Sequence, residues 1–297
     1  MTRRTVLAMA AAQIPVPAQE ARFIKGFCAA LFPASMPYVE SMRQVRNAGF
    51  QAFELKVGQG ELPLDCSLSD ARRLADAAAA MKLQIASLWA LTPSSPSLVS
   101  TNAAIQQDAR LRVMKAIELA PALGCEAILV TPAVLGKGGV MEITSDDAWR
   151  RSTAAFREFL PLAQKNKVTL TPENVWSRFL VSPRDMREFI DQFQSDFVRA
   201  HFDVGNVLQF GYPEDWIAAL GPRIRRVHFK DYKLAAGGRQ GTFAPLFEGD
   251  VQWKSVMAAL VKTGYRGFVS AETAIDASDP ESLLKISRAM DRIFSLA

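Results

Sequence analysis

Short apolar runs alternate with longer amphipathic segments along almost the whole chain. From residue 23 onward, eight such runs have the length of buried strands, and each precedes a segment with helical periodicity. The predicted strands are 24–31, 52–57, 84–89, 127–131, 168–174, 199–203, 226–229 and 267–272, and the predicted helices are 38–47, 68–81, 105–123, 146–166, 183–193, 213–220, 251–263 and 280–296. Eight successive strand–helix units predict an α/β fold, a (β/α)8 TIM barrel in one domain over residues 21–297.

Residues at the element boundaries agree with this pattern. Serine or aspartate followed by proline starts two of the predicted helices, at Ser182-Pro183 and near Pro280. Glycines just before the next strand end three others, at Gly49, Gly124 and Gly264. An open doubly wound sheet would need a glycine-rich phosphate turn after its first strand, and residues 27–33 are not one. The long connectors 90–100 and 233–250 are expected on the face that carries the site.

Composition narrows the class of protein. The 297 residues suit one barrel-sized domain, with 49% hydrophobic and 22% charged residues. Leaving out Arg3 and Arg4 reduces Lys and Arg from 35 to 33, against at most 30 Asp and Glu. This near balance and the lack of a dense basic stripe argue against nucleic acid as a partner. The three cysteines have no metal-binding spacing, and no apolar stretch reaches the ~18 residues that a membrane span requires.

The N-terminus differs from the rest of the chain. Paired arginines, Arg3 and Arg4, precede a short apolar segment and then small residues, as in a twin-arginine export signal. Residues 1–20 are therefore expected to be an export signal that directs the protein to the periplasm. The alternative is a disordered basic leader on a cytoplasmic protein.

Four side chains able to bind a metal stand near the ends of predicted strands. Glu173, Asp203, His228 and Glu272 are separated by 30, 25 and 44 residues, close to one strand–helix unit with a longer last interval. Because the carboxyl ends of barrel strands meet on one rim, the four side chains are expected to converge there. The chain has only two histidines, which gives weight to His228 at such a position. Three carboxylates and one imidazole suit Mn²⁺, Mg²⁺ or Co²⁺ with open coordination positions.

Open coordination positions indicate catalysis on a sugar. A carbonyl and a neighbouring hydroxyl can fill them, and the metal then acidifies the C–H beside the carbonyl and stabilises an enediolate. Two carboxylates flanking that carbon would supply the base and the acid on opposite faces. Each glutamate alone is equally well explained as a solvated charge on a loop. Solvated loop charges do not explain why four such side chains stand in register at strand ends.

Segments around these residues resemble the xylose-isomerase-like TIM-barrel superfamily, in particular its sugar phosphate isomerase/epimerase branch. The segments are 172–180 (PENVWSRFL), 201–206 (HFDVGN), 227–231 (VHFKD), 247–253 (FEGDVQW) and 271–272 (AE). The resemblance covers residues 22–296 and is specific for the superfamily, not for the substrate. It implies that Glu173, Asp203, His228 and Glu272 bind one divalent metal. It also implies that Glu173 and Glu272 act as the catalytic acid/base pair.

Further residues near strand ends are candidates for substrate binding. Glu54 stands where the family often has glutamate, and it either orients the substrate or a catalytic group or pairs with Lys56. Lys230 follows His228 by two residues and is expected to point to the same side, toward a hydroxyl or phosphate. Asn206 replaces a sugar-contacting histidine of several epimerases, and this departure argues against a close match to the ketose 3-epimerases.

Three more polar residues are expected near the site. Asn174 and Asp231 are predicted to support the metal ligands from behind by hydrogen bonds. Glu248, in a Glu-Gly-Asp turn, is expected either to contact substrate or to fix the loop before the next helix.

Aromatic residues and the second histidine complete the candidates. Trp89 and Trp176 lie near strand ends, where each either stacks on a sugar face or packs in the barrel wall. His201 precedes Asp203 by two residues, so its side chain is expected on the same side but one layer lower. That position favours a buried, hydrogen-bonded histidine over a fifth metal ligand.

The leading functional prediction is a divalent-metal-dependent sugar isomerase or epimerase with one metal ion, Mn²⁺ first, and a small carbohydrate substrate. The alternative is a lyase or hydratase on 3-keto-glycosides or inososes, which would expel a β-substituent from the same enediolate. A DNA-repair endonuclease of the same superfamily would need more histidines and a basic groove, and the two histidines and nearly balanced charge argue against it. A non-catalytic sugar-binding barrel would not require both glutamates. Monomer and homo-oligomer both stay open.

Overall fold

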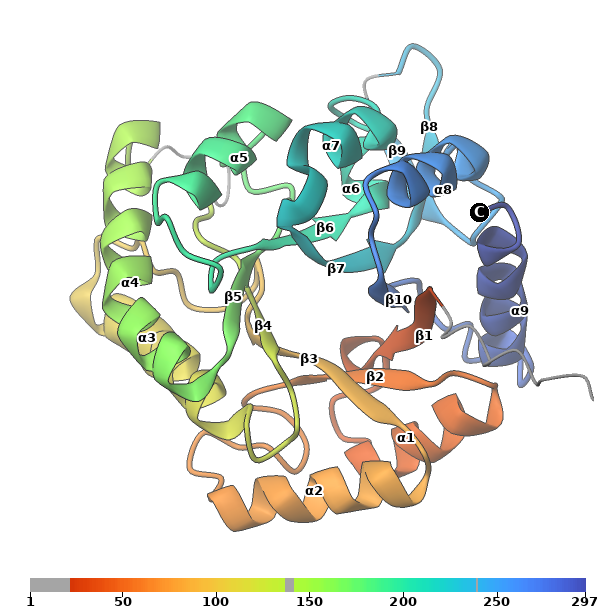
Figure 1. Ribbon diagram of the computed structural model, residues 1–297, viewed down its shortest axis with the longest axis horizontal. Coiled ribbons are helices and arrows are strands. Elements are labelled where there is room, and N and C mark those ends of the chain that lie inside the picture. Colours follow the sequence, from red (N-terminus) through yellow and green to blue (C-terminus); the bar gives the residue numbers. More distant parts are fainter. Residues whose placement is uncertain (1–21, 137–141, 239) are drawn as a thin grey trace, which may run out of the picture.

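The eight apolar runs of the sequence become the eight parallel strands of one sheet. A computed structural model of the chain describes residues 22–136, 142–238 and 240–297. Within these residues the strand order is β5-β4-β3-β2-β1-β10-β7-β6, and helices surround the sheet (Figure 1). This arrangement confirms the predicted (β/α)8 barrel. The strands are β1 (Phe23–Cys28), β2 (Ala52–Lys56), β3 (Gln84–Leu91), β4 (Ala127–Val130), β5 (Thr169–Pro172), β6 (Ala200–Asp203), β7 (Ile224–Phe229) and β10 (Gly267–Ala271).

The barrel closes between β5 and β6 through only a few contacts. Two isolated parallel bridges join this seam, Leu170 to Val198 and Glu173 to His201. The side chain of Asn174 adds two hydrogen bonds with the backbone of Asp203, because its Nδ2 donates to the carbonyl and its Oδ1 accepts from the amide, each at 2.8 Å. A side chain at the carboxyl end of β5 therefore helps to close the barrel.

Helices follow the strands in the expected alternation. Two of them start with a capping box, formed by a serine and the aspartate three residues later. The serine hydroxyl accepts a hydrogen bond from the aspartate amide, and the aspartate carboxylate accepts one from the serine amide. These pairs are Ser67 with Asp70 and Ser182 with Asp185. The helices are α1 (Tyr38–Asn47), α2 (Leu68–Ala80), α3 (Ala103–Leu119), α4 (Ser145–Asn166), α5 (Pro183–Asp191), α6 (Val204–Val207), α7 (Pro213–Leu220), α8 (Trp253–Lys262) and α9 (Ser282–Phe294), with 3-10 turns η1 (Ala29–Leu31) and η3 (Gly221–Arg223).

Some predicted boundaries were wrong by a few residues. The first strand ends at Cys28, and the apolar residues after it form η1. Helix α3 ends at Leu119, with Ala120 after it still in the helical conformation, because Pro121 has no N–H to continue the helical hydrogen bonds. Helix α9 begins at Ser282, two residues after Pro280, because Asp279 accepts the Glu281 amide at 3.0 Å and forms a turn instead.

The segment 233–250, predicted as a plain connector, contains part of an antiparallel hairpin. Its strands are β8 (Asp231–Leu234) and β9 (Gly241–Ala244), and β8 starts just after the carboxyl end of β7. Asp231, which is fully buried, accepts from the amides of Phe247 at 2.9 Å and Val251 at 3.2 Å and from Trp253 Nε1 at 3.1 Å. The hairpin and the loop after it are therefore held at the rim that carries the ends of the strands.

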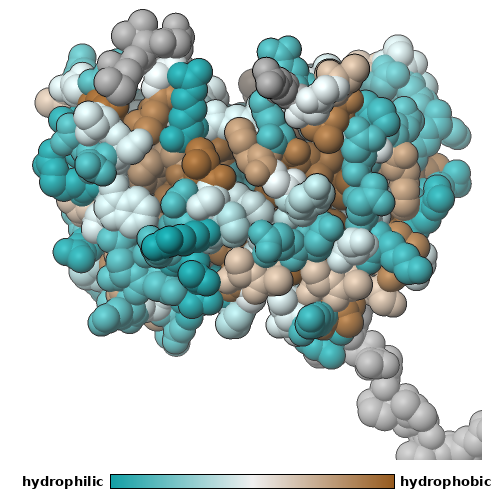
Figure 2. Space-filling model, turned by 90° about the horizontal axis from the view of Figure 1, so that it is seen from above, coloured by the Kyte–Doolittle hydropathy of each residue, from teal (hydrophilic) through white to brown (hydrophobic). Residues whose placement is uncertain are grey.

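Figure 2 shows one face of the molecule, turned by 90° from the view of Figure 1. Hydrophilic residues cover much of this face, and hydrophobic residues gather mainly in its upper half. Among the helices that the structure describes, none is both long and apolar enough to cross a membrane. The predicted export signal or leader at residues 1–20 lies outside the described residues.

Candidate metal centre and active site

The four predicted metal ligands meet at one end of the barrel. Asp203 ends β6, His228 lies in β7, and Glu173 and Glu272 directly follow β5 and β10. One ligand atom from each lies within 4.8 Å of those from the other three. Parallel strands in register bring together four side chains that span 100 residues of sequence, as the spacing predicted.

The imidazole of His228 is at the centre of this group. Its Nδ1 lies 3.3 Å from Glu173 Oε1, 3.2 Å from Glu272 Oε2 and 3.9 Å from Asp203 Oδ2. Lys230 Nζ forms ion pairs with Glu272 Oε2 at 2.7 Å and with Asp203 Oδ2 at 3.1 Å. All of these side chains except Lys230 and Glu272 are fully buried or nearly so.

The donor set fits a divalent cation. Asp203 Oδ2, His228 Nδ1 and Glu272 Oε2 are buried, and within the described residues none of them makes a hydrogen bond of acceptable geometry. Buried polar atoms without such partners are costly, and a shared cation would satisfy all three. Three carboxylates and one imidazole are the ligands of an oxygen-rich site for Mn²⁺, Mg²⁺ or Zn²⁺.

The pKa values of the cluster follow from burial and mutual charge. Burial raises the pKa of Glu173 to about 7, and the charges of Glu272 and Asp203 act in the same direction. Burial also raises the pKa of Asp203 to about 6, although the Lys230 ammonium opposes this. Burial acts in the same sense on Glu272, but Lys230 and His228 outweigh it and hold the pKa of Glu272 well below its usual range. Two carboxylates of one site therefore differ strongly in proton affinity.

Asn174 and Asn206 hold the Asp203 ligand in place. Asn174 bonds to both backbone groups of Asp203 across the seam, and the Asn206 amide donates to Asp203 Oδ1 at 2.8 Å. The Asn206 side chain donates to the Asn174 carbonyl at 3.0 Å. These bonds orient Asp203 so that its other oxygen, Oδ2, faces the cluster. The side-chain amide of Asn206 is thus engaged with the protein backbone.

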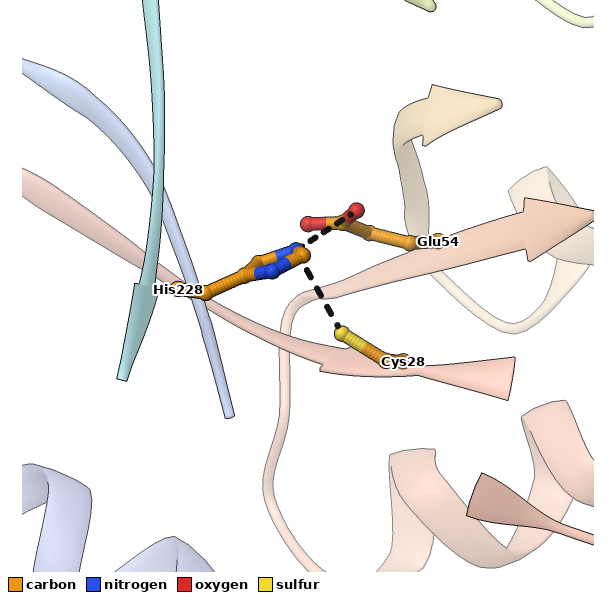
Figure 3. A group of neighbouring side chains, drawn as sticks. All are labelled: Cys28, Glu54 and His228. Atoms are coloured by element: carbon orange, nitrogen blue, oxygen red, sulfur yellow. Dashed lines mark hydrogen bonds and ion pairs between the residues drawn. The ribbon is translucent and has the colours of Figure 1, made fainter. Parts of the chain in front are cut away.

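Glu54 lies on the other side of His228, inside the barrel (Figure 3). Its Oε2 is 3.2 Å from His228 Nε2 and accepts hydrogen bonds from Ser87 Oγ and from Trp89 Nε1, the latter at 2.7 Å. Glu54 is 1% exposed, and its partners are these protein donors and not Lys56, which was one of the two alternatives expected from the sequence. The contacts of Glu54 therefore favour a role in positioning His228 over direct contact with substrate.

A cavity of about 340 Å³ opens beside the metal cluster. Lys230 and Glu272 supply its charged groups, and the apolar part includes Leu31, Phe243 and Pro245. The Lys230 ammonium lies 4.8 Å from the centre of the Phe243 ring. The volume of the cavity is in the range of small-molecule binding sites.

The two tryptophans occupy different places. Trp89 is 5% exposed and packs against His228 with 5.4 Å between the ring centres, as a wall residue. Trp176 is 40% exposed, donates to the Asn206 carbonyl at 3.0 Å and stacks on Phe243 of β9 at 4.8 Å. Trp176 is thus the tryptophan at the rim of the site.

Two other candidates, Asp231 and Glu248, lie on the hairpin and the loop after it. Asp231 accepts hydrogen bonds from the loop amides described above. These bonds support the loop and not the candidate metal ligands, which Asp231 was expected to support. Glu248 is exposed on that loop, and its amide donates to the Pro245 carbonyl at 3.0 Å.

The structure adds residues that the sequence reasoning did not place at the site. Cys28 has its Sγ 3.7 Å from His228 Nε2. Phe243 reaches the cavity from the unpredicted hairpin. His201 is fully buried, as expected, with its Nε2 2.8 Å from His228 Nε2. Strand alternation signalled His201, but no local pattern marks Cys28 or Phe243.

Comparison with known families identifies the class of protein. The chain matches the model of the xylose isomerase-like TIM barrel family over residues 42–293, and it therefore belongs to that family. A comparison with curated proteins found no match.

Several solved structures share the fold. A D-tagatose 3-epimerase-like protein has a TM-score of 0.76 at 18% identity, over 92% of this chain and 97% of its own. The IOLI protein with a bound zinc atom has a TM-score of 0.76 at 15% identity, over 92% and 98%. The 3-keto-D-glucoside 4-epimerase YcjR from E. coli has a TM-score of 0.73 at 15% identity, over 92% and 99%. At these identities the likeness shows the fold alone.

Proposed function

We propose that this protein is a divalent-metal-dependent sugar isomerase or epimerase that moves a proton on the carbon beside a carbonyl. One observation carries the proposal. Glu173, Asp203, His228 and Glu272 converge at a cavity that Glu272 lines, with three carboxylates and one imidazole nitrogen close enough to share one cation. Solved structures with the same fold include sugar epimerases and proteins with bound zinc or magnesium, which supports the same chemistry.

The four residues would hold the metal, with Mn²⁺ as the proposed ion and Mg²⁺ or Co²⁺ as substitutes. A bound ion supplies Lewis acidity to the sugar carbonyl. Asp203 and His228 would act as ligands only, because Asp203 is fixed by backbone amides and His228 is buried on all sides.

Glu173 and Glu272 would move the proton. Because Lys230 keeps Glu272 as a carboxylate, Glu272 is suited to take the proton from a sugar carbon in the cavity that it lines. Glu173 would act as the second carboxylate, on the opposite face of that carbon. In the metal-free protein burial raises the pKa of Glu173 to about 7, and binding of the ion would require its ionised form.

Lys230 and the rim aromatics would position the sugar. The Lys230 ammonium lines the cavity between Glu272 and Phe243 and can donate to a sugar oxygen after the ion pairs rearrange. Trp176 and Phe243, both partly exposed, offer flat apolar surface against a sugar face.

The test is proton exchange in D₂O. The Mn²⁺-loaded protein would be incubated with ketoses, inososes and 3-keto-glycosides, and mass spectrometry and NMR would locate deuterium. We expect deuterium at the carbon beside the carbonyl of one sugar class, with a change of configuration or of carbonyl position. Glu272→Gln should lower kcat about 10²–10⁴-fold, while Glu118→Gln, at an exposed site on α3, should leave it unchanged.

Two results would count against the proposal. Full activity of the Glu272→Gln protein on a confirmed substrate would refute the acid/base assignment. Release of a β-substituent without a stereochemical change would show elimination in place of isomerisation.

A further inference from the structure

The buried side of His228 carries a second group of polar side chains. His228 Nδ1 faces Glu173 and Glu272, whereas its Nε2 faces His201, Glu54 and Cys28. Figure 3 shows Glu54 and Cys28 beside this imidazole. Cys28, Glu54 and His228 offer ligand atoms within 4.8 Å of one another and are all fully buried, which alone is compatible with a second metal site. The hydrogen atoms that these groups require decide between a second metal and a hydrogen-bond network.

Glu54 places a hydrogen on Nε2 of His228. A carboxylate only accepts hydrogen bonds, and Oε2 of Glu54 already accepts from the hydroxyl of Ser87 and the indole N–H of Trp89. The same oxygen is 3.2 Å from His228 Nε2, so this nitrogen must be the donor of that contact.

His201 leads independently to the same assignment. The hydroxyl of Thr171 donates to the Ile128 carbonyl at 2.8 Å, which leaves its oxygen free to accept from His201 Nδ1 at 3.4 Å. With its hydrogen on Nδ1, His201 presents the lone pair of Nε2 to His228 Nε2, 2.8 Å away. Nε2 of His228 thus carries one hydrogen, and both Glu54 Oε2 and His201 Nε2 accept from it.

We infer that Glu54, with His201, is a positioning residue that holds the Nε2–H tautomer of His228 and directs the Nδ1 lone pair to the metal. The inference rests on the proposed metal centre. A histidine ligand that donates its other N–H to a carboxylate is oriented and made a stronger ligand by it. A second metal at Cys28, Glu54 and His228 would need the lone pair of Nε2, which the hydrogen occupies.

The first experiment locates the hydrogen directly. His201 and His228 are the only histidines of the chain, so ¹⁵N-histidine labelling of the Zn²⁺-loaded protein gives two spin systems. We expect a metal-bound Nδ1 and a protonated Nε2 on His228, and a protonated Nδ1 on His201. A His201→Gln protein assigns the signals. A protonated Nδ1 or a metal-bound Nε2 on His228 would overturn the inference.

The second experiment measures metal binding by isothermal titration calorimetry. The wild type should bind one equivalent of Mn²⁺, Glu54→Gln should bind it about 10–100-fold more weakly, and Cys28→Ser should keep one equivalent at near-normal affinity. A wild type that binds no metal would refute the proposed function itself. Unchanged affinity in Glu54→Gln, or loss of a second equivalent in Cys28→Ser, would refute only the present inference.

Discussion

At the scale of single residues, chemical role follows from environment more than from residue type. Glu173 and Glu272 both follow a barrel strand, yet Lys230 holds Glu272 ionised while burial favours a proton on Glu173. Glu54 has the same side chain but lies inside the barrel with three protein donors around one oxygen. Three glutamates of one site therefore have three proposed tasks.

The sequence predicted that the four candidate ligands converge, because strand ends share one rim, and it could not assign these finer tasks. Spacing along a strand says on which side Glu54 lies, but not that Ser87 and Trp89 of β3 reach its oxygen. The side-chain bonds of Asn206 to Asn174 likewise depend on the seam between β5 and β6. Contacts between distant segments decide these roles, and no local pattern encodes them.

The metal-free protein should lose stability as pH rises from about 5 to 8. Glu173 and Asp203 have folded pKa values of about 7 and about 6, above their values in an unfolded chain, so the folded state binds more protons in this window. The free energy of unfolding then falls with pH. Urea titrations from pH 5 to pH 8 would measure this, and Glu173→Gln, which binds no proton, should show a smaller slope.

Metal binding should show the opposite pH dependence. The ligands must lose their protons to bind the ion, so the stabilisation by Mn²⁺ should grow over the same pH range. Without metal, the free energy of unfolding should instead fall with pH. If it rose from pH 5 to pH 8, equally in the wild type and in Glu173→Gln, the proton affinities assigned to Glu173 and Asp203 would be wrong.

At the scale of elements, the strands and helices were largely predictable and the hairpin was not. Hydrophobic periodicity identifies the buried strands and the amphipathic helices, since one face of each packs in the core. The hairpin β8–β9 is half exposed, so it has little apolar pattern, and it is held mainly by Asp231 and by Asp250, which accepts the Leu234 amide at 2.8 Å. Tertiary hydrogen bonds thus define this part of the rim.

Gly249 should be essential for the loop beside the cavity. A Cβ at this position would lie 2.0 Å from Asp231 Oδ1 and 2.7 Å from the Tyr232 amide nitrogen, so the loop would have to move. Gly249→Ala should destabilise the protein by about 1–3 kcal/mol and raise KM. At Gly211 the nearest atom to an added Cβ is 3.6 Å away, which makes Gly211→Ala a matched control with little effect. Equal stability of the two variants in urea would contradict this account of the loop.

At the scale of the whole molecule, the proposed metal centre lies across the least connected part of the barrel. Its ligands come from both sides of the seam, with Glu173 following β5 and Asp203 ending β6, where two backbone bridges and Asn174 join the strands. An ion held by ligands on both strands would therefore close the barrel as well as serve catalysis. Figure 1 shows β5 and β6 side by side, where this closure would complete the barrel.

Metal should consequently stabilise the entire fold. An ion that binds only the folded chain at 100 times its Kd adds about 2.7 kcal/mol to the free energy of unfolding. Differential scanning calorimetry with Mn²⁺ and with EDTA would measure the shift in Tm. The shift should be greatly reduced in Asp203→Asn and kept in Glu118→Gln, and an equal shift in both would place the ion elsewhere.

The most direct test of the central claim is the anomalous scattering of Mn²⁺ in a crystal of the protein. The account predicts one strong peak about 2.0–2.3 Å from an oxygen of Glu173, Asp203 and Glu272 and from Nδ1 of His228. Open coordination positions should face the cavity that Lys230 and Phe243 line. A peak at Cys28, Glu54 and Nε2 of His228, or no peak at the four strand ends, would contradict it.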